Sequence, residues 1–297
     1  HTVSEHDLDQ FLQHAVNGLV LGATYALLGI GLTLIFGIMR VVNFAHGELY
    51  ALGAYAAYAM VSLLGLDFFS ALVFSAAIGF LFGWAIEFLL LRRCKLENID
   101  EVMLIMIGVM IIMQNAELML WGGVGKTVPS PFPQEPLVFG EVSLSPIRLF
   151  VLCAAAVLLV AFYFVIERSR LGMAMRATFQ DRDAARIVGV NVSLIYTLTF
   201  ALGSALAAVT GALLAPIFMV SPTMGDLASL KAFAIVILGG LGNIAGAGLG
   251  GFALAMIEEF GAGYVSTAYR DALGFLVILA VMIVRPQGLF SVKERVG

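Results

Sequence analysis

Ionisable residues are scarce in this chain, and two of them, His46 and Glu48, stand in a short motif at the start of an apolar segment. The motif consists of Asn43, Phe44, Ala45, His46, Gly47 and Glu48. Asn43 can cap a helix, because its side-chain oxygen can accept from the free N–H groups of the first turn, and Gly47 permits close backbone packing. Such residues are candidates for a gate or a pivot. We favour the structural interpretation, in which His46 and Glu48 bond to each other or to nearby backbone.

A second group of charges, between residues 167 and 192, contains the pattern of a short helix. Its central residues are Asp183, Ala184, Ala185, Arg186 and Gly189. Thr178 or Asp181 can cap the start of this helix, and Gly189 suits its end. The two alanines and Val188 share one face, which a partner could approach closely. The alternative is an ordinary solvated loop whose arginines only set the membrane topology.

A third motif interrupts the apolar run 230–258 with glycine. Its residues are Gly239, Gly240, Gly242 and Asn243. The run is long enough for one tilted helix or for two short helices with a broken centre. Broken helices persist in lipid only where the freed backbone groups face protein or a wet cavity.

The other polar groups inside apolar segments show no recognisable catalytic pattern. They are Glu87, Gln114, Asn115, Glu117, Glu258 and Glu259. Glu258 and Glu259 could contact a zwitterionic ligand or a docking protein. We favour interfacial exposure or hydrogen bonds between helices, because the sequence places no matching cation beside them.

No motif predicts catalysis, a metal or a bound nucleotide. Gly125-Lys126-Thr127 imitates the end of a P-loop, but the position that requires the earlier glycine holds Leu120. The four histidines are too dispersed for a metal site. We therefore expect neither an enzyme nor a cofactor, and we expect that the chain itself binds no ATP.

These motifs are set in a chain whose composition is that of a membrane protein. Of its 297 residues, 61% are hydrophobic and 12% are charged, and the mean hydropathy is +1.00. An average soluble domain is about 45–50% apolar and about 25% charged. A soluble fold would expose large apolar patches, and disorder is excluded by the same numbers. The net charge of −4 argues against a nucleic-acid partner.

Long apolar runs predict an all-α transmembrane bundle of about eight spans, built as one domain of residues 1–297 and surrounded by lipid. The expected spans are 14–37, 47–65, 69–91, 102–121, 147–166, 194–218, 230–258 and 272–285. The first residues lack the basic region of a signal peptide. Because the chain begins with His1 rather than Met, we expect that its native start has been trimmed or replaced.

Basic residues predict the orientation, because they collect on the cytoplasmic side. Twelve of the 16 fall on one predicted side: Arg40, Arg92, Arg93, Lys95, Arg168, Arg170, Arg176, Arg182, Arg186, Arg285, Lys293 and Arg295. The N-terminus is then outside and the C-terminus inside, with residues 167–192 and 43–48 near the inner face. This orientation favours a run 230–258 that crosses twice or re-enters, returning residues 259–271 to the outside. The proline-rich outer loop 122–146 is expected to be extended.

Several of these segments resemble a known family. Residues 183–189 read DAARIVG and resemble the EAA loop of ABC importer permeases, with aspartate in place of the family's glutamate. Residues 17–48, and above all 43–48, resemble LivH-type branched-chain amino acid permeases, as do residues 238–243 and 285–289. Together these matches extend over essentially the whole chain.

The resemblance implies a permease subunit of a bacterial ABC importer in the inner membrane, working by ATP-driven alternating access. It implies as partners a second homologous permease, two cytoplasmic ATPases and a periplasmic substrate-binding protein, with residues 167–192 as the segment that couples to an ATPase. The substrate would be a branched-chain or other hydrophobic amino acid, and urea or a short amide is an alternative within the family. A stand-alone secondary transporter or channel would suit the glycine-rich break but has no use for a coupling loop.

Overall fold

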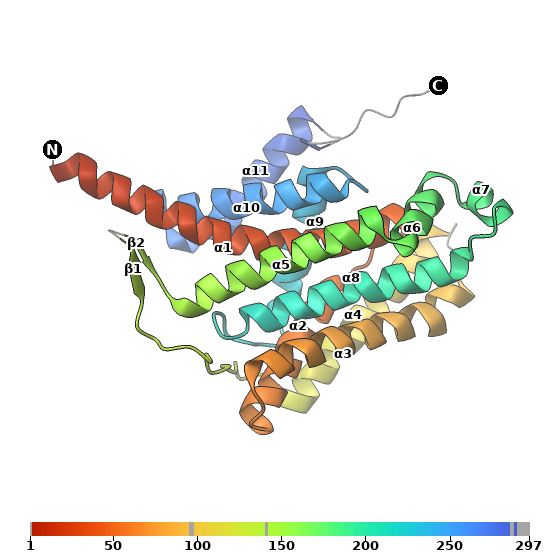
Figure 1. The fold of residues 1–297 in the computed structure, drawn as a ribbon, viewed down its shortest axis with the longest axis horizontal. Coiled ribbons are helices and arrows are strands. Elements are labelled where there is room, and N and C mark those ends of the chain that lie inside the picture. Colours follow the sequence, from red (N-terminus) through yellow and green to blue (C-terminus); the bar gives the residue numbers. More distant parts are fainter. Residues whose placement is uncertain (1, 95–97, 140–141, 286–287, 290–297) are drawn as a thin grey trace.

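The computed structural model describes residues 2–94, 98–139, 142–285 and 288–289, and the described chain is a bundle of eleven α-helices (Figure 1). They are α1 (Thr2–Met39), α2 (His46–Tyr58), α3 (Phe68–Leu89), α4 (Ile99–Trp121), α5 (Pro146–Arg168), α6 (Arg170–Gln180), α7 (Arg182–Ile187), α8 (Val192–Leu214), α9 (Met224–Gly239), α10 (Ile244–Tyr264) and α11 (Arg270–Val284). A π-helical turn, Ala59–Leu63, extends α2, and short 3-10 turns lie at Leu91–Arg93 and Thr267–Tyr269.

One small sheet accompanies the helices. The loop between α4 and α5 carries β1 (Leu137–Phe139) and β2 (Val142–Leu144), which pair antiparallel with Leu137 opposite Leu144. We expected this loop to be extended, and the hairpin is the one departure from the all-α prediction within the described residues.

Seven helices of the described chain are long and apolar enough to cross a membrane. They are Asp9–Met39, Phe68–Arg93, Ile99–Trp121, Pro146–Arg168, Val192–Leu214, Ile244–Tyr264 and Thr267–Val284. The predicted all-helical membrane bundle is thus confirmed, but with seven candidate spans instead of about eight. The expected span 47–65 is not among them. The structure has α2 and its π-helical extension there, a segment that begins with the polar residues His46 and Glu48.

The glycine-rich motif separates two helices rather than bending one. α9 ends at Gly239, and Asn243 caps α10 by accepting from the N–H of Gly246 at 3.0 Å. Between them, Gly240 and Gly242 have φ angles of 89° and 80°, which other residues rarely adopt. One continuous tilted helix, the first of the two predicted alternatives, is therefore wrong.

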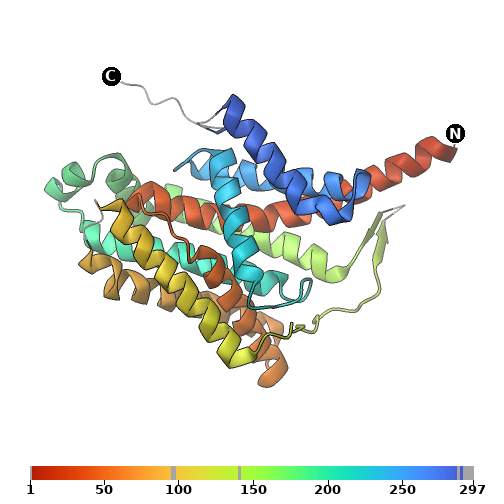
Figure 2. The same cartoon turned by 180° about the vertical axis from the view of Figure 1, so that it is seen from behind.

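α9 and α10 run antiparallel. Gly239 lies against Gly246 next to the turn, and Lys231 contacts Glu258 further along the pair. α9 begins beside α2, where Ser229 bonds to Gly47, and crosses the bundle away from it (Figure 2). The chain therefore reverses its direction between α9 and α10.

Contacts between distant segments define two ends of the bundle. At the N-terminal end, Gln13 bonds to Ser143 at 2.9 Å, and Lys126 pairs with Val220. The opposite end carries α6 and α7, and we call it the α7 end (Figure 1). There the N–H of Leu289 donates to a backbone carbonyl of α9 at 2.9 Å.

α1 and α8 form the centre of the bundle, and the other candidate spans are more exposed. Close approach of helix backbones depends on glycine: a side chain on Gly53 of α2 would overlap the backbone of α8 at Ala208, and one on Gly251 of α10 would overlap α1 at Ala26. Small residues at helix contacts are the usual means of packing helices in lipid. α4 packs mainly on α2 and stands at the edge of the bundle.

Candidate functional site

The motif at residues 43–48 lies inside the bundle rather than near its surface. α1 ends at Met39, Arg40 adopts a left-handed conformation with φ of 57°, and a non-helical stretch leads back to His46. The Nε2 of His46 donates to the carbonyl of Leu28 at 3.0 Å, about three turns before the end of α1. The position near the inner face stays a prediction. The burial of the motif inside the bundle was not predicted, because charge counting locates helix ends and not a segment that folds back between them.

The start of α2 is bound to α9 through one serine. Ser229 Oγ accepts from the N–H of Gly47 at 3.0 Å and donates to the carbonyl of Phe44 at 3.3 Å. A side chain on Gly47 would overlap α9, so glycine is required there. The N-cap is Ala45 and not Asn43, whose Oδ1 instead accepts from the N–H of Ala45 at 3.1 Å. The motif therefore fixes α2 against α9.

Glu48 faces a second carboxylate. Its side chain is 0% exposed, and Glu117 of α4 is 2% exposed; the two are close enough to repel each other. Tyr55, two turns after Glu48, interacts electrostatically with both. Neither the four carboxylate oxygens nor the Tyr55 hydroxyl has a hydrogen-bond partner among the described residues, so the expected bond between His46 and Glu48 is not formed. We call Glu48, Tyr55 and Glu117 the Glu48 cluster.

A second buried group of charges is paired. The Lys231 network comprises Tyr25, Lys231, Glu258, Glu259, Arg270 and Asp271. Lys231 Nζ lies 2.8 Å from Glu258 Oε2 and 2.8 Å from Asp271 Oδ1. Arg270 donates to Glu259 at 2.7 Å. These bonds join α9, α10 and α11, and the Tyr25 hydroxyl adds α1 by donating to Glu258 at 2.8 Å.

The network confirms one expectation and corrects another. Glu258 and Glu259 make the hydrogen bonds between helices that we favoured. The statement that no cation could be placed beside them was wrong, because Lys231 and Arg270 arrive from other helices. Sequence reasoning missed both cations, although a lone lysine within an apolar helix was a usable signal.

The remaining polar groups of the apolar segments bond between or within helices. Glu87 accepts from Thr197 of α8 at 2.5 Å. Gln114 donates to Asp226 of α9 at 2.9 Å, and Asn115 donates to the backbone of its own helix. Glu117, with no such partner, is the exception among them.

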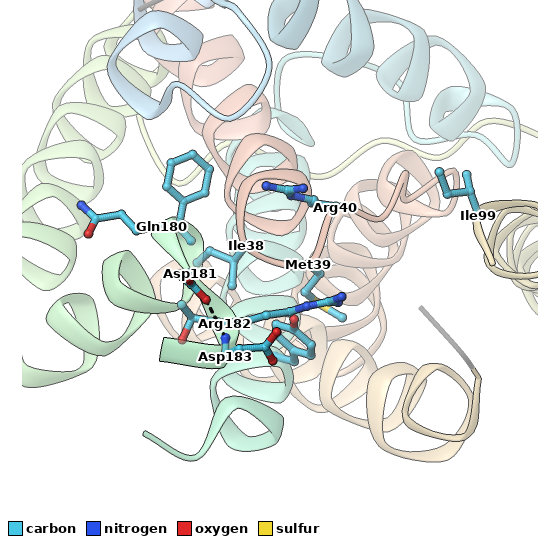
Figure 3. A pocket seen from close by; sticks show the side chains of 11 residues that line it. Ile38, Met39, Arg40, Ile99, Gln180, Asp181, Arg182 and Asp183 are labelled. Atoms are coloured by element: carbon cyan, nitrogen blue, oxygen red, sulfur yellow. Dashed lines mark hydrogen bonds between the residues drawn. The ribbon is translucent and has the colours of Figure 1, made fainter. Parts of the chain in front are cut away.

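The coupling-like segment at the α7 end begins with a capped helix. Asp181 accepts from the N–H groups of Asp183 and Ala184, each at 2.9 Å, and Figure 3 shows the bond from Asp183. These two bonds hold the pKa of the Asp181 carboxyl below its usual range. Of the two expected caps, Asp181 is confirmed, and Thr178 lies within α6. Gly189 follows α7 with φ of 92°, as its predicted role at the helix end requires.

The exposed face of α7 differs from the predicted one. Asp183, Ala184, Arg186 and Gly189 are exposed. Ala185 is only 3% exposed, whereas Ile187 and Val188 are 87% and 77% exposed. The two alanines therefore do not share a free face, because Ala185 turns into the protein. The surface offered to a partner is the one that carries Ile187 and Val188.

A cleft of about 430 Å³ separates this segment from the end of α1. It is lined by Met39 and Arg40, by Ile99 at the start of α4, and by residues 178–183 and Tyr196 (Figure 3).

Phe179 of α6 connects this segment to the glycine-rich break. A side chain added at Gly242 or at Gly37 of α1 would meet the Phe179 ring. One residue of the coupling-like segment thus touches both the last turns of α1 and the turn between α9 and α10.

Some predicted features lie outside the described residues. These are Lys95, Pro286, Gln287, Lys293 and Arg295. Leu289 of the C-terminal motif bonds to Leu238. The two C-terminal segments that resemble the family, residues 238–243 and 285–289, are therefore neighbours in space.

Comparison with known proteins identifies the family that this chain matches. Residues 14–283 match the family described as branched-chain amino acid transport system / permease component. The high-affinity branched-chain amino acid transport system permease protein BraD of Pseudomonas aeruginosa is 35% identical over 97% of this chain and 98% of its own length. LivH of Escherichia coli, a permease protein of the same description, is 33% identical over 96% of each chain.

A different permease of the same kind of system is also similar. LivM of Salmonella typhimurium is 29% identical over 91% of this chain and 68% of its own length. No solved structure matches the chain significantly.

Proposed function

The chain belongs to the family of branched-chain amino acid transport permeases, and on this premise we propose that it carries branched-chain or other hydrophobic amino acids across the inner membrane of a bacterium. It is a multi-pass permease component of a transport system and not an enzyme. The observation that carries the proposal is the match to BraD and LivH over almost the whole of each chain. A stand-alone carrier is disfavoured, because this family consists of components of larger systems.

The proposed assembly contains a second permease, two cytoplasmic ATPases and a periplasmic substrate-binding protein. The similarity of this chain to LivM as well as to LivH supports a pair of related permeases, since one chain resembles both. In this assembly the α7 end faces the cytoplasm, which the arginines of residues 167–192 favour. The N-terminal end then faces the binding protein.

The proposed mechanism is ATP-driven alternating access transmitted through α6 and α7. Ile187 and Val188 are exposed apolar side chains on a capped helix, and such a surface suits a groove on an ATPase. Movement of α6 reaches α1 and the α9–α10 turn through Phe179. Closure of the ATPases on ATP would open the permease outward, and hydrolysis would reset it.

Competitive uptake tests the substrate. The complex is reconstituted in liposomes with its ATPases and binding protein, and uptake of labelled leucine is measured against excess valine or urea. We expect ATP-dependent leucine uptake that valine suppresses and urea leaves unchanged. Transport of urea without transport of leucine would overturn the proposed substrate class.

A substitution on the exposed face of α7 tests the coupling segment. We expect Ile187→Arg to abolish ATP-driven uptake while the chain still inserts in the membrane, because a charge then occupies the apolar contact. Ile187→Ala is the matched control and should keep most of the uptake. Normal uptake and normal ATPase association in Ile187→Arg would remove the coupling role from α7.

A further inference from the structure

The Glu48 cluster holds five buried oxygens that have no partner among the described residues. They are the carboxylate oxygens of Glu48 and Glu117 and the hydroxyl of Tyr55, on side chains that are 0%, 2% and 0% exposed. Buried polar groups in native proteins are nearly always hydrogen-bonded, so each exception requires an explanation. An ionised carboxylate buried without a partner is the most unfavourable case.

The three side chains are directed toward one another by two helices. Glu48 and Tyr55 are separated by two turns of α2 and share a face. Glu117 comes from α4, where Trp121, one turn further on, stacks on the Tyr55 ring with centroids 4.6 Å apart. The two carboxylates and the hydroxyl all interact electrostatically.

A further carboxylate lies near the cluster, and no cation of the described residues offsets it. Asp226 of α9 repels Glu48, and the nearby amide of Gln114 is already bonded to Asp226 at 2.9 Å. Gly225 presents only hydrogen to the Glu48 carboxylate, because a side chain there would overlap it. The other buried carboxylates, Glu87, Glu258 and Glu259, all have bonding partners.

We propose that Glu48, Tyr55 and Glu117 bind a primary ammonium group, and that this group is the α-ammonium of the transported amino acid. An ammonium group carries one positive charge and three N–H donors, which match the three acceptor groups of the cluster, two carboxylates and one hydroxyl. The proposal rests on the proposed function, which supplies an ammonium-bearing substrate. A lysine of the second permease has the same chemistry and is the competing source.

The site is closed in this structure, and α4 is the element whose movement would open it. α4 packs mainly on α2, through the Tyr55–Trp121 stack and the bond from Gln114 to Asp226. Separation of α4 from α2 would uncover both carboxylates. A site that is closed between the outward and the inward states is what alternating access requires.

Leucine binding to the assembled complex, without the binding protein, tests the proposal. Labelled leucine is competed with leucinamide, which keeps the ammonium, and with 4-methylpentanoate, which lacks it. We expect Glu48→Gln and Glu117→Gln each to raise the Kd for leucine about tenfold or more, because each removes a bond to a charged group. Glu101→Gln, at an exposed position of the same α4, is the matched control and should change nothing.

The outcomes separate the sources and the hypotheses. Leucinamide should compete and 4-methylpentanoate should not; equal competition would overturn the ammonium site. If both glutamine variants lose the second permease while the remaining complex keeps its Kd for leucine, the cluster binds a lysine of that permease. This result would overturn the substrate site. Normal ATP-driven leucine import with an unchanged Kd in both variants would overturn the site alone. A wild-type complex that imports no leucine would overturn the proposed function itself.

Discussion

The Lys231 network and the Glu48 cluster are two buried acidic groups in one bundle, and they differ in whether the protein supplies the cation. In the network, Lys231 and Arg270 neutralise Glu258 and Glu259 and join helices that are distant in the sequence. In the cluster, Glu48 and Glu117 face each other without a cation from the described chain. Both groups are expensive to bury. The network contributes structure, whereas the cluster is left incomplete for a ligand.

The largest effect should follow from breaking the network. Lys231→Met leaves Glu258 buried without its cation, and removal of one partner of a buried pair costs about 3–5 kcal/mol. We expect this loss in the unfolding free energy of the purified chain in detergent. The control is Lys231→Met combined with Glu258→Met, which should recover much of the loss because the buried Glu258 carboxylate is then absent, while Asp271, the other partner of Lys231, is 44% exposed and stays hydrated. A single variant as stable as the wild type would show that the network carries no structural role.

A smaller effect should follow from crowding the cluster. Gly225→Ala places a methyl group on the Glu48 carboxylate, and overpacking of this kind costs about 1–3 kcal/mol. We expect lower thermal stability and slower leucine uptake. Gly108→Ala on α4, where nothing lies within 4 Å, is the matched control and should be neutral or slightly stabilising. Equal behaviour of the two variants would mean that the carboxylate has room to move.

Neutralising the cluster should have an effect on stability opposite to that of breaking the network. Glu48→Gln removes a buried charge that has no partner in the chain, so we expect unchanged stability or a gain of up to about 1 kcal/mol. Glu258→Gln, measured in parallel by thermal unfolding, should lose stability because it breaks the bond to Lys231. A loss of stability in Glu48→Gln as large as in Glu258→Gln would mean that the chain itself supplies a partner for Glu48.

The smallest effect concerns an exposed carboxylate that only backbone groups bind. The two backbone bonds hold the pKa of Asp181 below its usual value of 3.8, so the contribution of this carboxylate to α7 is complete above that value. The contribution is lost as the pH falls through the lower folded pKa. Asp181→Ala should loosen α7 at neutral pH and abolish its acid sensitivity, measured as amide hydrogen exchange at residues 183–188. Asp183→Ala should leave that sensitivity intact.

The sequence predicted the helical membrane bundle well and the cluster poorly. Apolar runs gave six of the candidate spans directly, because each long helix must match the thickness of the bilayer. The cap at Asp181 was also predictable, since capping is local. The position of His46 was not, because its bond to Leu28 depends on a stretch that folds back across the helix before it.

The partners of the buried glutamates were likewise not predictable from the sequence. Glu117 and Glu258 are both acidic residues in apolar helices, and the residues around each of them along the chain do not show which partner it meets. One lies beside a lysine from α9 and the other beside a second carboxylate from α2. Partners of this kind come from tertiary packing, which periodicity does not encode.

By itself, the sequence determined that this chain is a helical membrane protein, that five of its twelve arginines lie between residues 167 and 192, and that its glycines at 239–242 could break a helix. Those properties depend on local composition and spacing. Lipid requires apolar helices whose backbone groups are bonded, and basic residues collect on the cytoplasmic side. Only the tertiary structure decided which buried charges are paired, that Ala185 turns inward, and that the motif at 43–48 lies within the bundle. Each of these depends on how helices distant in the sequence approach one another, and that approach is fixed by glycine contacts spread over the whole chain.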